Sequence, residues 1–269
     1  MGTGFLLGYA LPQRTPQGQP YYGYLVTAKH VLQDAERLGA QSLVARSADR
    51  KTGRPIDFDV DVCGSEGKAH WLGHPKSEVD VAVLPVLVAN IKAAGAQVSL
   101  LPSDIGCWTL TQMQRVGVLE GDGVFVLGFP LGLVDDVIPA PIVRAGVVAR
   151  IRDTYADPVR APLIETAAFP GSSGGPVFIR PEVTSIPDTR AVQESRCIGL
   201  ITTVYTWDDV AVSQSTNQAR VVFVENAGLA KMEPIDRALH IIEADIERRR
   251  SSGTLPAFPA VTPQVDRVN

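Results

Sequence analysis

The chain has 269 residues, of which 45% are hydrophobic and 20% charged, a composition typical of globular domains. Its 25 Lys and Arg against 29 Asp and Glu give a net charge of −4, which excludes a general electrostatic attraction to nucleic acid or anionic membranes. The longest apolar run, residues 81–89, contains Pro85 and is far shorter than the about 20 residues that cross a bilayer. We therefore expect neither nucleic acid nor a membrane among its partners.

Short runs rich in β-branched and aromatic residues, separated by turn residues, recur along most of the chain. They lie at residues 4–10, 22–28, 42–46, 56–62, 79–88, 123–127, 142–151, 163–166, 176–179, 198–204 and 220–224. Many short strands with turn signals between them predict an all-β sandwich or barrel. The weakly patterned stretch at 102–118 is the expected connection between two β units, so we place barrel one at about 1–105 and barrel two at about 120–226.

Helical periodicity is strong in one place, near the C-terminus. Behind Pro234, apolar residues follow the i, i+3, i+4, i+7 spacing of one helix face: Ile235, Ala238, Leu239, Ile242 and Ile246. This predicts a helix at about 234–250 whose apolar stripe packs on a barrel wall. A shorter helix is expected at residues 33–38, closed by Gly39. Residues 251–269 contain three prolines and no periodicity, and we expect a flexible tail there.

The cysteines and the N-terminus bear on location. Cys63, Cys107 and Cys197 are odd in number and form no CxxC pair, which indicates buried thiols rather than a disulfide framework or a thiolate zinc site. The N-terminus has no Lys or Arg before its apolar stretch and lacks the basic region of a signal peptide. We expect a cytoplasmic protein, the alternative being an exported one whose signal is absent from this chain.

Three segments carry residues suited to acyl-transfer chemistry. Ser173 lies in a glycine-rich turn, but a serine hydroxyl needs a base to take its proton. His30, at the end of an apolar strand, can be that base, and Asp80, ahead of another, can hold its tautomer and stabilise its positive charge. The backbone amides of Gly171 and Ser173 are placed to bind the developing oxyanion. No cofactor or metal is needed for this chemistry.

These segments resemble those of trypsin-like (chymotrypsin-fold) serine peptidases, and within them the bacterial HtrA-type branch. The resemblance spans about residues 2–243 and rests on G-x-S-G-G-P at 171–176, T-A-x-H at 27–30 and D-V-A-V-L at 80–84. Residues 2–5 resemble the G-S-G-F opening strand of the HtrA branch, and residues 128–132 its G-x-P-x-G turn. No PDZ-like domain is expected after residue 243.

The resemblance implies two six-stranded antiparallel β-barrels with the triad His30, Asp80 and Ser173 between them. It also implies a hydroxyl hydrogen bond from Thr202 to Asp80, and pairing of a substrate backbone with Thr203 and Val204. The primary pocket falls at Ala167, Ala168 and Phe169. The resemblance thus implies a serine endopeptidase that acts on a protein or peptide. Because no carboxylate lies at the pocket positions, we expect cleavage after small or medium apolar residues.

Two departures from secreted digestive members concern control. Val31 stands where they have a disulfide-bonded cysteine, and Ser172 stands where they have the Asp that captures a freed N-terminus. Activation by N-terminal cleavage is therefore not expected. We expect the polar loops at 180–196 and 205–218 to gate the active site, with a possible activating protein partner.

Three other interpretations stay open. Residues 171–175 also satisfy G-x-S-x-G, the nucleophile elbow of α/β-hydrolases, although that fold needs a histidine after the serine and alternating helices. His70 and His74 are spaced like two zinc ligands on a helix, but Pro75 favours a loop. The third is a catalytically latent or inactive binding module that keeps the peptidase fold and needs a partner for activity.

Overall fold

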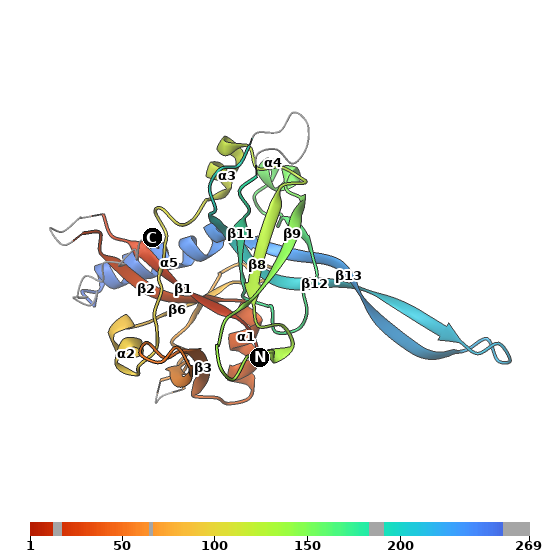
Figure 1. Ribbon diagram of the computed structural model, residues 1–269, viewed down its shortest axis with the longest axis horizontal. Coiled ribbons are helices and arrows are strands. Elements are labelled where there is room, and N and C mark those ends of the chain that lie inside the picture. The colour runs from red at the N-terminus through yellow and green to blue at the C-terminus, as the bar shows by residue number, and fades with distance from the viewer. Residues whose placement is uncertain (13–17, 65–66, 183–190, 255–269) are drawn as a thin grey trace.

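The computed structural model describes residues 1–12, 18–64, 67–182 and 191–254. Within them the chain forms two β units, joined by a connection and followed by a C-terminal helix (Figure 1). Most of the expected strands are present, several with the predicted bounds, because alternating apolar residues bounded by turn residues define them.

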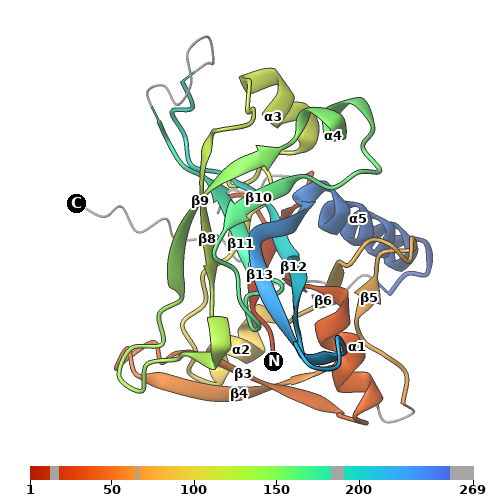
Figure 2. The same cartoon turned by 90° about the vertical axis from the view of Figure 1, so that its right-hand side faces the viewer.

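The first unit is an open sheet and a separate ribbon rather than a closed six-stranded barrel. The sheet has the order β5-β6-β2-β1-β7, with strands β1 (Gly4–Ala10), β2 (Tyr21–Thr27), β5 (Leu72–Gly73), β6 (Ala82–Pro85) and β7 (Leu101–Pro102). Strands β3 (Ser42–Ala48) and β4 (Pro55–Asp61) pair with each other as a two-stranded ribbon (Figure 2). The strand expected at 79–88 ends at Pro85, which has no amide hydrogen to continue a ladder.

The second unit is the closed six-stranded barrel that the sequence predicts, in the order β10-β13-β12-β11-β8-β9. Its strands are β8 (Gly123–Gly128), β9 (Ile142–Arg150), β10 (Leu163–Thr166), β11 (Pro176–Ile179), β12 (Cys197–Val212) and β13 (Ala219–Pro234). The barrel encloses a core of buried aliphatic side chains that includes Val124, Val126, Ile164, Val177 and Ile201. The barrel strands run on to Pro234, beyond the predicted end at 226.

Short helices fill the connections. They are α1 (Lys29–Arg37), α2 (Val88–Ala93), α3 (Leu110–Val116), α4 (Arg152–Ala156) and the 3-10 helix η1 (Pro130–Gly132). Helix α3 lies in the connection between the units, where Thr109 and Gln112 form a capping box and Gly117 ends the helix with φ +89°. Local capping residues thus fold a stretch in which apolar periodicity is weak.

Helix α5 (Ile235–Ser251) is the predicted C-terminal helix. Its apolar face, including Ile235, Ala238 and Ile242, is buried in one core with Leu7 and Val26 of the first unit, as the sequence predicts. No helix in the described part of the chain is long and apolar enough to span a membrane.

The three cysteines are thiols in the structure. Cys63 is half-buried, whereas Cys107 and Cys197 are buried and meet in a β-bridge between the inter-unit connection and the start of β12. A hydrogen bond with Cys197 and burial both raise the pKa of the Cys107 thiol, so it stays protonated at neutral pH.

The expected loop at 205–218 is instead largely β-strand. Strands β12 and β13 remain paired from the barrel out to Val212 and Ala219, and together they project from the body as a long hairpin (Figure 1). The prediction of a gating loop fails here because residues 205–212 and 219–226 are rich in valine and aromatic residues that favour strand pairing. The middle of the other expected gating loop, residues 183–190 of 180–196, lies outside the described residues.

Candidate active site

His30 and Asp80 form a preorganised pair within the first unit. His30 is the second residue of α1, and Asp80 precedes β6. Asp80 Oδ2 lies 2.6 Å from His30 Nδ1, while Asp80 Oδ1 accepts the His30 backbone N–H at 2.9 Å. One carboxylate therefore fixes the imidazole and also satisfies an otherwise unpaired amide in the first turn of α1.

The same contact sets the proton affinity of the histidine. The hydrogen bond to Asp80 raises the pKa of His30, while partial burial opposes the shift. The imidazole therefore accepts a proton more readily than a free histidine, as a general base requires. With Nδ1 bound to the carboxylate, Nε2 is the nitrogen left to take a proton from another group.

The loop between β10 and β11 that carries Ser173 consists of two consecutive tight turns, and Ser173 lies in the second. In the first, the Ser172 N–H donates to Phe169 O at 2.9 Å, with Gly171 in third position at φ +95°, as in a type II turn. In the second, Gly174 has φ +88°. A Cβ at Gly174 would overlap the backbone oxygen of Thr3, so glycine is needed there for space as well as for backbone angle.

The amides of Gly171 and Ser173 are free to bind an anion. Among the described residues neither donates to a protein acceptor. The Pro170 carbonyl accepts the Leu131 N–H at 2.6 Å, and because a trans peptide unit directs its C=O and N–H to opposite sides, the Gly171 N–H points away from Leu131. Both amides that the sequence assigns to an oxyanion hole are therefore available as donors.

Thr3 fixes this loop, and sequence reasoning gave it no role beyond the G-x-G-F motif. It is buried; its N–H donates to Ser173 O at 2.8 Å, and its hydroxyl donates to Gly171 O at 2.7 Å. The same hydroxyl accepts the Phe129 N–H at 3.0 Å, and Thr27 Oγ1 donates to Thr3 O at 2.7 Å. Thr3, directly before β1, thus joins the serine turn to the segment that leads into His30.

The Ser173 hydroxyl has its own partner. Ser173 Oγ donates to Thr202 O at 3.4 Å, and no hydrogen bond in the described part of the chain joins it to His30. The Gly174 N–H donates to Ile201 O at 2.7 Å, so β12 supports the serine from beside it. Transfer of the Ser173 proton to His30 therefore requires rotation of the hydroxyl away from Thr202.

The predicted bond from the Thr202 hydroxyl to Asp80 is not formed. Thr202 Oγ1 is buried and has no hydrogen-bond partner among the described residues. The Asp80 segment is supported instead by Glu233, a buried carboxylate on β13. Glu233 Oε1 lies 3.5 Å from the Asp80 backbone nitrogen and 2.7 Å from Lys231 Nζ, and Lys231 also donates to Glu78 O at 3.1 Å. Sequence spacing gives no sign of this contact, because 153 residues separate its partners.

Thr203 and Val204 are the next residues of β12 after Thr202, whose carbonyl accepts the hydrogen bond from Ser173. Both pair with β13 on one side, opposite Lys231 and Ala230. On the other side β11 pairs with β12 only as far as Leu200, so no described strand covers that edge at Thr203 and Val204. An extended peptide can add there as a further strand.

The residues of the predicted primary pocket differ in exposure. Ala167 is exposed, Phe169 is half-buried, and Ala168 is buried in the barrel core, with its carbonyl accepting a hydrogen bond from Asn226 Nδ2. The Arg144 guanidinium lies 4.9 Å from the centre of the Phe169 ring, a cation–π contact that the sequence did not reveal. The pocket region therefore has no acidic group among its predicted residues and a cation beside one of them.

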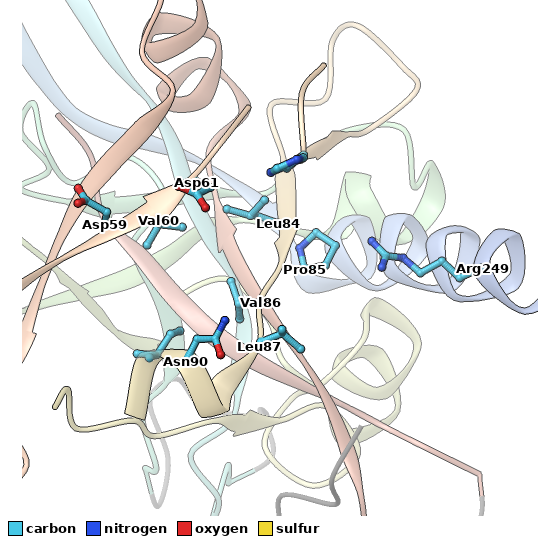
Figure 3. A pocket seen from close by; sticks show the side chains of 11 residues that line it. Asp59, Val60, Asp61, Leu84, Pro85, Val86, Leu87, Asn90 and Arg249 are labelled. Carbon is cyan, nitrogen blue, oxygen red and sulfur yellow. The ribbon is translucent and has the colours of Figure 1, made fainter. Parts of the chain in front are cut away.

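Two cavities border the first β unit, and neither is lined by His30, Asp80 or Ser173. A pocket of about 440 Å³ between β4, β6, α2 and α5 contains none of the triad residues (Figure 3). A second cavity, of about 690 Å³, lies between the β3–β4 ribbon and β1–β2 and includes Thr3, Thr27 and Phe129 in its lining. The missing closure of the first unit leaves this space.

The two histidines considered as a metal pair lie in separate surroundings. His74 is buried after β5, with Nε2 3.3 Å from His240 Nδ1 of α5, and burial lowers its pKa to about 4. His70 lies next to Gly64 in a different turn. The described residues contain no group of three or more His, Cys, Asp or Glu arranged to hold a metal ion.

Fold and site together define a chymotrypsin-like serine-peptidase architecture, with a histidine–carboxylate pair on one β unit and a glycine-bounded serine on the other. The family model of the trypsin-like peptidase domain matches residues 2–181, two thirds of the chain. The chain belongs to this family.

Comparison with solved structures gives distant likenesses. A thermostable serine protease, AL20, from an extremophilic microorganism is 15% identical, with a TM-score of 0.41 over 90% of this chain and 95% of that one. Human heparin binding protein is 12% identical, with a TM-score of 0.45 over 90% and 89% of the two chains. The comparison with curated proteins finds no match.

Proposed function

We propose that the chain is a serine endopeptidase that hydrolyses peptide bonds through an acyl-enzyme intermediate. The observation that carries the proposal is the 2.6 Å contact of Asp80 with His30 Nδ1, beside a serine turn whose Gly171 and Ser173 amides are free. Ser173 Oγ attacks the carbonyl carbon while His30 Nε2 takes its proton, and the two amides bind the oxyanion. His30 then gives the proton to the leaving amine, and water releases the acyl group by the same steps.

The test is covalent labelling together with turnover. Wild-type protein should react with a fluorophosphonate probe at Ser173, located by peptide mass spectrometry, and should cleave casein or a matched peptide. Ser173→Ala should abolish both and keep the fold, whereas Ser47→Ala, which removes an exposed hydroxyl of β3, should change neither. A wild-type chain that no such probe labels would point to the non-catalytic binding module instead.

For specificity we propose cleavage after small or medium apolar residues. The support is that Ala167, Ala168 and Phe169 offer no carboxylate to a substrate cation, and that Arg144 beside Phe169 further disfavours Lys and Arg. The measurement is a peptide-library cleavage profile. Dominance of Lys and Arg at the cleaved position would contradict the pocket assignment.

We also propose that activity is restrained until a substrate or protein partner binds. The support is the Ser173 hydroxyl, which is bonded to Thr202 O and must rotate before it reaches His30. The isolated chain should turn over a good peptide slowly at first and faster as substrate occupancy rises, with the turn at 169–175 gaining protection from amide exchange. Hyperbolic kinetics with full protection of that turn from the outset would contradict restraint.

Two further assignments rest on sequence features. The HtrA-type branch is supported by residues 2–5 and 128–132, which the structure connects through the Thr3 hydroxyl and the Phe129 N–H. A cytoplasmic location is supported by three unpaired thiols. Thiol trapping in intact cells, followed by fractionation, tests the location: recovery of the chain in an exported fraction would contradict it.

A further inference from the structure

The outer part of the β12–β13 hairpin, residues 205–226, forms an arm that extends from the body (Figure 1). All of its residues are exposed except Ser213, and many are large and apolar. Eight have exposed fractions of 44% to 68%: Tyr205, Trp207, Val210, Val212, Val221, Val222, Phe223 and Val224. A two-stranded ribbon is only marginally stable in water, and a contiguous exposed apolar surface marks an interaction site. We therefore expect the arm to bind a partner.

The strand register divides the apolar residues between two faces. Val210 lies opposite Val222, and Asp208 lies opposite Val224. Since side chains alternate along a strand, Val210, Val212, Val222 and Val224 share one face, which we call the valine face. Trp207, Phe223 and Val221 belong to the other.

The charges are separated along the arm. On the valine face, Asp208 lies on the side of the Val210–Val222 pair nearer the barrel, and Arg220 lies on the side nearer the tip. Asp209 and Glu225 belong to the other face, opposite Phe223 and Trp207. If two arms pack antiparallel about a twofold axis at this pair, Arg220 of each arm meets Asp208 of the other. Valines then face valines. The same surface is thus complementary to itself, as a twofold interface requires.

Both ends of the arm fit this arrangement. At the tip, polar residues close the hairpin, with the Ser213 N–H donating to Gln218 O at 2.9 Å and Asn217 at φ +51°. At the base, Asn226 Nδ2 donates to Ala168 O, which ties the arm to the barrel. We propose that the arm is a dimerisation surface whose partner is a second copy of this chain, the two valine faces packing antiparallel.

The first test is oligomeric state, measured by sedimentation velocity on full-length Ser173→Ala protein to avoid self-digestion. We expect a concentration-dependent monomer–dimer equilibrium. Val222→Lys should weaken the dimer about tenfold or more, because it places like charges together at the axis. Val44→Lys, which changes an even more exposed valine on the β3–β4 ribbon, should leave dimerisation unchanged. A chain that is monomeric at every concentration, or a dimer that Val222→Lys leaves intact, would overturn the proposal.

The second test reads the antiparallel geometry. Arg220→Glu leaves only acidic charges on the valine face, and Asp208→Arg leaves only basic ones. Each variant should dimerise weakly alone because like charges then meet, and an equimolar mixture should form a heterodimer at least as well as the parent chain. Failure of the mixture to associate would contradict the antiparallel arrangement. These outcomes do not depend on catalysis, so they stand or fall separately from the proposed peptidase activity.

Discussion

The two halves of the candidate site are held in different ways. In the first β unit, His30 and Asp80 contact each other directly through charged side-chain hydrogen bonds. In the second, Ser173 is held through its backbone, by turns that need glycine and by contacts with Thr3, while its hydroxyl bonds to Thr202 O. The difference teaches that the proposed acid–base pair is preformed, whereas the position of the proposed nucleophile depends on contacts across the boundary between the units.

The largest effect is expected from breaking the preformed pair. Asp80→Asn keeps the shape of the side chain but removes the negative charge and can hold His30 in the wrong tautomer. We expect kcat to fall by about 10⁴, the scale known for this change in a serine-protease triad. Steady-state kinetics measures it, with far-UV circular dichroism as the check on the fold. Loss of less than about tenfold would show that Asp80 does not orient the base.

The backbone support of the nucleophile is tested next. Gly171→Ala introduces a Cβ 2.6 Å from Phe129 O at a residue with φ +95°, so the turn must shift and move its amides. We expect kcat/KM to fall by about 10² to 10³, as for removal of an oxyanion donor. Gly39→Ala, also at positive φ but with open space for a Cβ, is the matched control and should cost stability without changing kcat/KM.

A smaller effect is expected at the contact between the units. Thr3→Val removes the hydroxyl that bonds to Gly171 O and Phe129 N and leaves both groups buried without that partner, whereas Thr3→Ser keeps it. We expect Thr3→Val to lower kcat about tenfold and Thr3→Ser to restore it. Equal activity of the two variants would show that the hydroxyl does not position the serine turn.

The smallest effect is expected in the pH profile of activity. Because hydrogen bonding to Asp80 raises the pKa of His30, and the base must be neutral, kcat/KM should fall below a midpoint above the ordinary histidine value of about 6.5. Asp80→Asn should move that midpoint downward. The raised pKa of His30 also stabilises the folded protein. This stabilisation is present at pH below the unfolded pKa of the histidine and is lost as pH rises through its folded pKa, so it decreases over the pH range in which kcat/KM increases. A midpoint below about 6.5 in the wild type would contradict the preformed pair.

Local patterns in the sequence determined most of the strands and helix α5, and they singled out His30, Asp80 and Ser173 as the candidate triad. Alternation, capping and glycine-rich turns are short-range properties, and a motif records them directly. The open first unit was not predictable, because whether β3 and β4 join a barrel depends on packing across the sheet. Within the arm, residues 205–218 are expected as a loop, whereas pairing with β13 extends β12 to Val212.

The finer geometry of the site was decided only by tertiary structure. Thr3 reaches the serine turn across 168 residues and Glu233 reaches the Asp80 segment across 153, separations over which no spacing rule applies. The Thr202 hydroxyl, assigned by resemblance to Asp80, has no hydrogen-bond partner in the part of the chain that the structure describes. Residue types thus specify which chemistry is available, and contacts between segments far apart in the chain decide which atoms meet.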